Sequence, residues 1–209
     1  MAVVDHLVFA ARDLASAVAS FEAATGIGPE VGGAHPGLGT RNALVSLGES
    51  YLELIGPDPD QGDPPGPRPF GIDDLVESGF VAFAIRPAAG ESLEGLADAV
   101  RYAGFDPGPV IDMRRRRPDG VELSWRLTLP PTGPTPDVPF LIDWGETPNP
   151  SATVARRADV GELRVGTPRH SEIGALYAAL GLSLPIRSSK RPALSASISG
   201  PNGNFGTRP

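Results

Sequence analysis

The sequence predicts an α+β fold built from a repeated strand, helix, strand, strand, strand unit. Hydrophobic residues alternate with a period of two in several short segments, which is typical of half-buried strands. Capped segments with helical spacing follow the first strand of each series. The same order of elements returns after a stretch rich in proline and glycine, which indicates repeated supersecondary units that share a core.

The first unit covers residues 1–56. The segment VDHLVFAA places His6 on the opposite face of a strand from its Leu and Phe side chains. Asp13 can cap the next helix and Gly26 can end it. The segments TRNALVSLG and YLELIG then form a hairpin, and Glu53 lies opposite the leucines of its strand. If the Leu and Phe faces are covered, His6 and Glu53 share the remaining face of one sheet.

Residues 57–78 are too rich in Pro and Gly for a helix or a central strand, so we expect a linker there. Residues 79–145 repeat the order of elements, with a helix capped by Ser92 and with VELSWRLTL and FLIDW as later strands. Residues 146–209 predict a partial third strand and helix unit that packs on the same domain.

Composition excludes several classes of function. The chain has 209 residues and no cysteine, which removes disulfides, zinc thiolate sites and thiol nucleophiles. A net charge of -7 disfavours nucleic acids and anionic membranes as partners. No apolar run approaches the roughly 20 residues that span a bilayer, so we expect a cytoplasmic protein without a membrane partner. The glycines of GLGTRN run into a strand and lack a third glycine, so we expect no nucleotide cofactor.

Several motifs resemble the glyoxalase-like branch of the vicinal oxygen chelate (VOC) superfamily. They are HPGLGTRN before LELIG, RPDG with SWRL, and PFLIDWG. The superfamily includes glyoxalase I, extradiol dioxygenases, methylmalonyl-CoA epimerase and the bleomycin resistance proteins. The resemblance implies that paired βαβββ modules form a curved mixed sheet shaped as a cup. It also makes a homodimer an expectation, because superfamily members often dimerise.

The resemblance implies metal ligands on the first and last strands of each module. These positions are His6 and Glu53 in the first module and Asp143 in the second, where Phe80 stands in place of a histidine. One imidazole and two carboxylates suit a divalent metal such as Mn, Fe, Zn, Ni or Mg. A shift of one residue in the last strand would exchange Asp143 for Ile142.

Other residues predicted on the cup face are candidates for binding a small-molecule ligand. His35 is one, although it could equally stabilise its turn, and Arg115 belongs to a run that is either a solvated strand edge or an anion site. The indoles of Trp125 and Trp144 are expected to pack under helices. The remaining candidates are Thr40, Asn42, Phe80, Ser124 and Arg126.

Two functions follow. The first is a VOC-type lyase, isomerase or dioxygenase for a small, oxygen-rich, anionic metabolite, in which Glu53 or Asp143 acts as a base beside the metal. The second is a metal-free protein that binds or sequesters a small molecule, as the bleomycin resistance proteins do. If Asp143 or Glu53 instead pairs with Arg126, the carboxylates form an ion network and the enzyme interpretation weakens.

Overall fold

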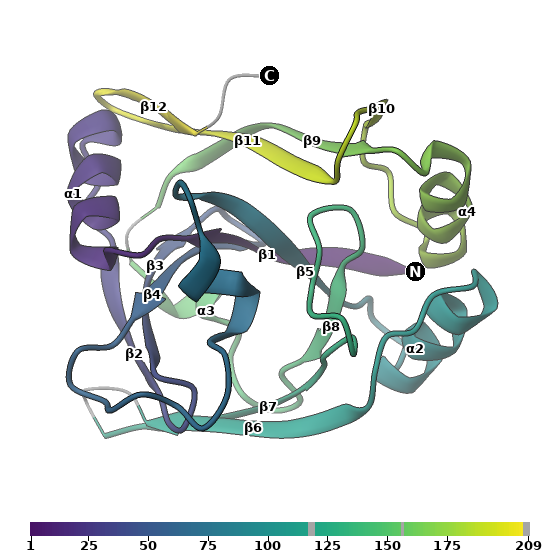
Figure 1. The fold of residues 1–209 in the computed structure, drawn as a ribbon, viewed down its shortest axis with the longest axis horizontal. Helices are drawn as coiled ribbons and strands as arrows, with labels where there is room; N and C mark the ends of the chain where they lie inside the picture. Colours follow the sequence, from purple (N-terminus) through teal and green to yellow (C-terminus); the bar gives the residue numbers. More distant parts are fainter. Residues whose placement is uncertain (117–119, 156, 207–209) are drawn as a thin grey trace.

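The computed structural model describes residues 1–116, 120–155 and 157–206. Its strands form two sheets (Figure 1). The large sheet has the order β2 (Glu30–His35), β3 (Thr40–Ser46), β4 (Tyr51–Pro57), β1 (Ala2–Ala10), β5 (Gly79–Pro87), β8 (Phe140–Asp143), β7 (Glu122–Thr128) and β6 (Val110–Arg116). The small sheet has the order β10 (Ile186–Ser188), β9 (Asp159–Thr167), β11 (Ala193–Gly200) and β12 (Gly203–Gly206).

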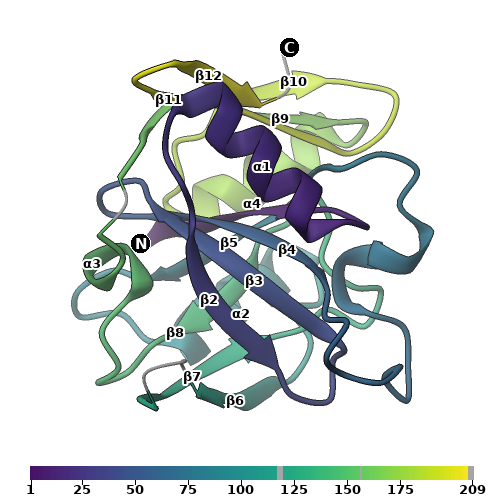
Figure 2. The same cartoon turned by 90° about the vertical axis from the view of Figure 1, so that its left-hand side faces the viewer.

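The large sheet has an internal symmetry that confirms the predicted α+β fold of paired βαβββ modules. Its central strands β1 and β5 pair in antiparallel fashion, and each pairs in parallel with the last strand of its own half, β4 or β8. The sheet curls until its two outer strands meet, where the Arg115 guanidinium of β6 donates to the Gly32 carbonyl of β2. Figure 1 shows the resulting ring of strands, and Figure 2 shows β2, β3 and β4 crossing it on one side.

The helix predicted after the first strand of each module is present with its predicted N-terminal cap. Helix α1 (Leu14–Thr25) follows Asp13, whose Oδ1 accepts the Ser16 N–H at 3.0 Å, and it ends at Gly26 with φ 75°. Helix α2 (Leu93–Tyr102) follows Ser92, whose Oγ accepts the Gly95 N–H at 3.1 Å. These side chains satisfy backbone donors that the first helical turn leaves unpaired.

The outer face of the large sheet carries the main hydrophobic core. Leu7 and Phe9 of β1 belong to this core together with Leu52 and Leu54 of β4, as their alternation predicts. The other faces of the same strands carry His6, Val8, Tyr51, Glu53 and Ile55 toward the interior of the ring.

The C-terminal unit forms a layer over the two central strands. It contains β9, α4 (His170–Leu180), β10, β11 and β12, so its order is that of a third and complete βαβββ series rather than the predicted partial unit. In Figure 1 its sheet lies above β1 and β5, between α1 and α4. Its buried residues belong to the same hydrophobic core as Leu7 and Phe9 of β1, and they include Val165, Ile173, Leu176, Leu194 and Ile198. The outer face of β1 is therefore covered by the C-terminal unit.

The segment predicted as a linker closes part of the ring. It carries a short 3-10 helix (Pro69–Asp74), which the sequence does not predict. Ile72 is fully buried, and Phe70 has a positive φ of 60°. A second short helix, α3 (Pro150–Thr153), packs against β3. None of the helices among the described residues is long and apolar enough to span a membrane.

We predict that the C-terminal sheet contributes directly to the stability of the whole domain. Replacing the fully buried Ile198 of β11 by Ala should lower the free energy of unfolding by about 2–5 kcal/mol, because it removes packing against the central strands. The same replacement by Ala at Val160, which is 39% exposed on the neighbouring β9, should change the free energy of unfolding by less than about 0.5 kcal/mol. Urea denaturation measures both, and equal effects of the two substitutions would contradict the layered packing.

Candidate functional site

A cavity of about 240 Å³ occupies the interior of the ring. Its wall is mostly apolar, and its polar side chains come from β1, β2, β3, β4 and β6. An apolar hollow with a few convergent polar groups is the usual form of a small-molecule site. The residues that line it are His6, His35, Leu38, Asn42, Leu44, Tyr51, Glu53, Ile55, Pro67, Pro69, Phe70, Met113, Arg115, Trp125, Leu127, Leu129, Phe140, Ile142 and Trp144.

His6 and Glu53 meet in this cavity, as the sequence predicts. They lie on the neighbouring parallel strands β1 and β4, and their Nε2 and Oε2 atoms are 3.8 Å apart. Both residues are buried, with exposed fractions of 3% and 7%. An imidazole and a carboxylate at this separation can each exchange a proton with one bound molecule.

Asp5 orients the imidazole of His6, although adjacent residues of a regular strand point to opposite faces. In the β1 and β5 ladder Val4 pairs with Ile85 and His6 pairs with Ala84, so Asp5 is the extra residue of a bulge. The bulge lets the Asp5 Oδ1 atom reach His6 Nδ1 at 2.7 Å. The Nδ1–H of a neutral His6 then donates to this carboxylate, and its Nε2 lone pair faces the cavity and Glu53.

The Asp5 carboxylate is fully buried and has three further donors. Its Oδ1 accepts the Trp144 indole N–H at 3.3 Å, and its Oδ2 accepts from Asn149 Nδ2 at 2.7 Å and from Arg86 Nη1 at 3.5 Å. A buried carboxylate requires such partners because its desolvation is costly. The sequence pattern does not single out Asp5, and its only signal is an acid directly before the candidate histidine in a strand.

Asn42 and His35 hold the other side of Glu53. Asn42 Nδ2 donates to Glu53 Oε1 at 2.5 Å, and it lies 3.3 Å from His35 Nε2. His35 Nδ1 lies 3.0 Å from the hydroxyl of Thr40, so its N–H donates to that oxygen while Nε2 accepts from Asn42. Thr40 is fully buried behind this pair rather than in the cavity wall. Glu53 Oε1 is therefore fixed, while Oε2 faces His6.

Burial sets the protonation of two ring side chains in the site. It lowers the pKa of His35 below 6.5, against the opposing effect of Glu53, and the Arg115 charge lowers it further. Burial likewise raises the pKa of Tyr51 well above 10, and the nearby Asp5 and Glu53 carboxylates add to this. His35 is thus neutral at pH 7 and Tyr51 keeps its phenolic proton. Tyr51 also stacks on His6, with ring centroids 4.6 Å apart.

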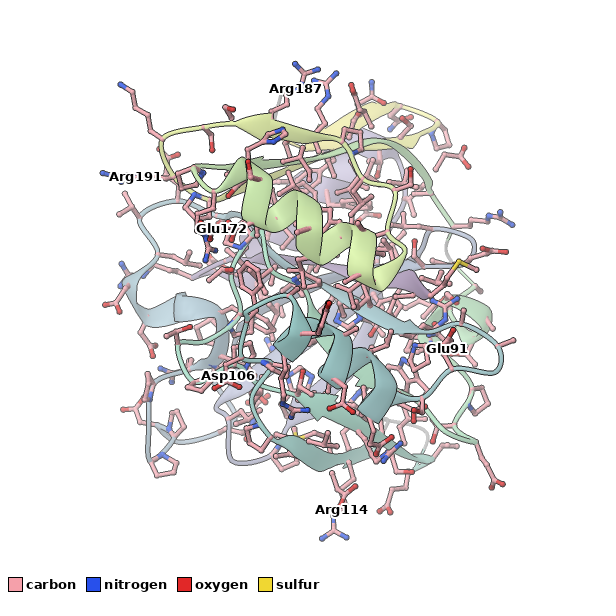
Figure 3. The ribbon with its side chains drawn as sticks, turned by 90° about the vertical axis from the view of Figure 1, so that its right-hand side faces the viewer. Glu91, Asp106, Arg114, Glu172, Arg187 and Arg191 are labelled. Carbon is pink, nitrogen blue, oxygen red and sulfur yellow. The ribbon has the colours of Figure 1, made fainter. Side chains whose placement is uncertain are left out.

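Arg115 reaches the cavity from β6, as one of the two alternatives for the arginine run predicts. It is 5% exposed. Its neighbour Arg114 is exposed and points away from the molecule at the bottom of Figure 3. The side chain of Arg116 and all of Arg117 lie outside the described residues. Arg115 therefore supplies a buried positive charge beside His35 and Tyr51.

Phe80 does not lie in the cavity, contrary to its predicted position. It packs in the outer core, with its ring centroid 5.3 Å from that of Phe9. The reason is a second irregularity in the β1 and β5 ladder, where Val8 pairs with Ala82 but Phe9 pairs with Phe80. The extra residue, Val81, reverses the face of everything before it in the strand.

Ser124, Arg126 and Asp143 also lie outside the cavity. Arg126 donates to Asp143 at 2.7 Å and to Glu94 at 2.6 Å, and Ser124 is exposed beside Thr147. Hydrogen bonds from Arg126 and from the Gly145 N–H lower the pKa of Asp143, against the opposing effect of desolvation. Asp143 is thus part of an ion network on the outer face and does not accompany Glu53.

The inner face of β7 and β8 is apolar instead. Trp125, Trp144 and Ile142 line the cavity, whereas the sequence analysis expects both indoles under helices. The error arose because the outer face of β7 is exposed at Glu122 and Ser124, so its apolar alternation points inward. Ile142 faces the cavity. This is the alternative in which the last strand is shifted by one residue and Ile142 replaces Asp143 on the inner face.

The comparisons with known proteins agree with this architecture. A family model described as glyoxalase-like domain matches residues 4–181. The chain belongs to the glyoxalase-like domain family. This membership confirms the resemblance to the VOC superfamily that the sequence motifs carry. A comparison with curated proteins found no match.

Several solved structures match this glyoxalase-like protein at low sequence identity. A hypothetical protein from Staphylococcus aureus is 14% identical, with 99% of this chain and 84% of that chain covered and a TM-score of 0.60. Methylmalonyl-CoA epimerase from Streptomyces coelicolor, in complex with 2-nitronate-propionyl-CoA, is 21% identical over 69% of this chain and 96% of that chain, with a TM-score of 0.44. Methylmalonyl-CoA epimerase from Mycobacterium tuberculosis is 17% identical, with 71% of this chain and 91% of that chain covered and a TM-score of 0.44.

The donor set does not fit the divalent metal that the resemblance implies. His6 and Glu53 could both contribute, but Asp143 is on the other face, and His35 approaches the opposite oxygen of Glu53 at 3.8 Å. The inward residues of β5 and β8 are Ala82, Ala84, Phe140 and Ile142, none of which binds metals. Among the described residues no three His, Asp or Glu side chains form a group that could hold a metal ion. A catalytic metal usually has three protein ligands.

We therefore predict that the protein purified without chelators carries far less than one equivalent of Mn, Fe, Ni or Zn. Two converging ligands leave any bound ion weakly held, so His6→Ala should not change the metal content. Elemental analysis of both proteins measures this. One equivalent of metal that is lost in both His6→Ala and Glu53→Ala would contradict it.

We also predict that His35 contributes a pH-dependent part of stability. Its folded pKa lies below 6.5, so as the pH falls the unfolded chain takes up this proton first. The free energy of unfolding should therefore be highest above pH 6.5. It should decrease as the pH is lowered from 6.5, by at most about 1.4 kcal/mol per pH unit from this group.

Urea denaturation across this pH range measures the effect, and His35→Gln should make the decline shallower. NMR titration of the His35 imidazole supplies the independent check. A His35 midpoint at or above 6.5 would show that burial does not control this group.

Proposed function

We propose that this glyoxalase-like protein is an isomerase or lyase that transfers a proton at a carbon next to a carbonyl group of a small, oxygen-rich, anionic metabolite. The observation that carries this proposal is the pairing of an imidazole and a carboxyl group in the cavity. His6 Nε2 and Glu53 Oε2 are 3.8 Å apart, and each side chain is fixed through its other polar atom, by Asp5 and Asn42 respectively.

Glu53 is assigned the role of general base. Its Oε2 takes the proton from the substrate carbon, and the electron pair of that C–H bond passes to the carbonyl oxygen to form an enolate. The Tyr51 hydroxyl and the Arg115 guanidinium line the same cavity and supply a donor and a positive charge for that oxyanion. Glu53 then returns this proton to the intermediate, or passes it to the Nε2 atom of His6, oriented by Asp5, which delivers it to another atom of the intermediate. The mostly apolar wall limits water, which strengthens these interactions.

The dioxygenase alternative requires a redox metal, and the two converging ligands do not favour one. The isomerase and lyase alternatives require only positioned acids and bases. For this reason the proton-transfer chemistry is assigned to the side chains themselves.

A metal-free binding protein is the second candidate. The observation that favours it is the aromatic and aliphatic wall opposite the polar residues, which suits retention of a ligand as well as its conversion. In this function Glu53 and His6 would hydrogen-bond the ligand without exchanging its hydrogens. The two functions therefore differ in whether a bound molecule exchanges a C–H hydrogen with solvent.

We predict that the protein accelerates exchange of the hydrogens beside the carbonyl of pyruvate, 2-oxobutyrate or phenylpyruvate in D₂O, which proton NMR follows directly. Glu53→Gln should lower the protein-dependent rate by about 10²–10⁴-fold, because it removes the base and keeps the shape. Asp143→Asn makes the same chemical change on the outer face and should leave the rate unchanged. Binding of these acids without any exchange would establish the second candidate and reject the first.

A further inference from the structure

We propose that the natural ligand of this cavity is an aryl-substituted oxo or enol acid, whose aromatic ring packs on Trp125 and Trp144 while its oxygen atoms lie at His6 and Glu53. The inference rests on the proposed function for its chemistry at the polar end. Its new element is the aromatic ring, which the wall of the cavity specifies.

The tryptophan pair forms the first part of the evidence. The chain has 2 tryptophans, and both line this cavity. Their ring centroids are 5.3 Å apart and their planes are inclined by 37°. They are 9% and 8% exposed, and both belong to the buried cluster of side chains that surrounds the cavity. Indole faces favour a flat aromatic partner over a puckered saturated ring of the same size.

Two phenylalanines extend this wall. Phe70 and Phe140 have ring centroids 5.9 Å apart, and both line the cavity. Phe70 is the only described residue other than glycine with a positive φ, at 60°. Such backbone strain persists where the surroundings require one particular side-chain position. The strained residue here places an aromatic ring against the wall.

The aromatic wall leads directly to His6. The Trp144 indole N–H donates to Asp5 Oδ1 at 3.3 Å, and Asp5 holds His6 at 2.7 Å. The Phe140 ring meets His6 edge to face, with centroids 5.4 Å apart. A ring on this wall therefore lies next to the imidazole, so its substituent reaches His6 and Glu53.

The polar end specifies the substituent. His6 Nε2 and Glu53 Oε2 make no hydrogen bond to any residue in the described part of the chain, and both are acceptors when His6 is neutral. A ligand atom between them must therefore present a hydrogen, as an enol O–H or an acidic C–H does. Arg115 places positive charge at the same end, which suits an ionised carboxylate on the ligand. A 2-oxo acid with an aryl group on its third carbon meets all these conditions.

Phenylpyruvate and 3-cyclohexylpyruvate are the matched probes, because they have the same carbon skeleton and the same 2-oxo acid group, and one ring is aromatic while the other is saturated. Calorimetry gives both affinities, and quenching of tryptophan fluorescence reports contact, since both indoles lie in the wall. We expect phenylpyruvate to bind roughly three- to tenfold more tightly and to quench the emission. In Trp125→Leu, which keeps an apolar wall, this preference should disappear. Tyr102→Leu changes an aromatic residue that is 92% exposed and should leave it intact.

Trp144→Phe provides a second test if Trp125→Leu does not fold, because Trp125 is then the only indole and its quenching reports the contact directly. Equal affinities, tighter binding of the cyclohexyl acid, binding of neither probe, or a preference that survives in Trp125→Leu would each overturn the inference.

Measurements on Glu53→Gln separate this inference from the proposed function. This variant lacks the base but retains the aromatic wall, so it should keep the preference for phenylpyruvate and lose hydrogen exchange. Aromatic preference without exchange in the wild-type protein would overturn the proposed function alone. Exchange with equal binding of both probes would overturn the aromatic ligand alone.

Discussion

The hydrogen bond between Asp5 and His6, 2.7 Å long, is the contact on which the rest of the site depends. It exists only because a bulge in β1 turns two consecutive side chains toward one face. The same carboxylate accepts from Arg86 on β5 and from Trp144 and Asn149 after β8. One buried charge thus joins the two halves of the sheet and fixes the ring nitrogen that faces the cavity. A substitution that left these donors unpaired would disturb fold and site together.

Closure of the large sheet imposes a second constraint, because the inner faces of its eight strands surround one common space. The two halves repeat the same topology but line this space differently. Strands β1, β3 and β4 contribute His6, Asn42 and Glu53, whereas β7 and β8 contribute indoles and aliphatic groups. The cavity therefore has a polar end and an aromatic end. A bound molecule is oriented by this difference, which is what proton transfer at one of its atoms requires.

The outer layers serve this interior by making its central strands rigid. The C-terminal sheet covers β1 and β5, so the strand that bears Asp5 and His6 is buried from Asp5 to its end at Ala10. The Pro- and Gly-rich segment closes another part of the ring through Ile72 and Phe70. Such coverage restricts the motion of the catalytic candidates, and rigid elements hold reactive groups in place better than loops do.

The sequence by itself determined the two repeated modules and the alternation of side chains along their strands. The two-residue period paired His6 with Glu53, and the caps at Asp13 and Ser92 located both helices, because these signals are local. Tertiary structure decided which face turned inward. One extra residue in a ladder reversed Phe80, and a second one recruited Asp5. Closure of the sheet left Glu122 and Ser124 of β7 exposed and turned the apolar face of that strand into the cavity. Bulges and sheet closure depend on pairing between strands distant in sequence, so no local pattern specifies them.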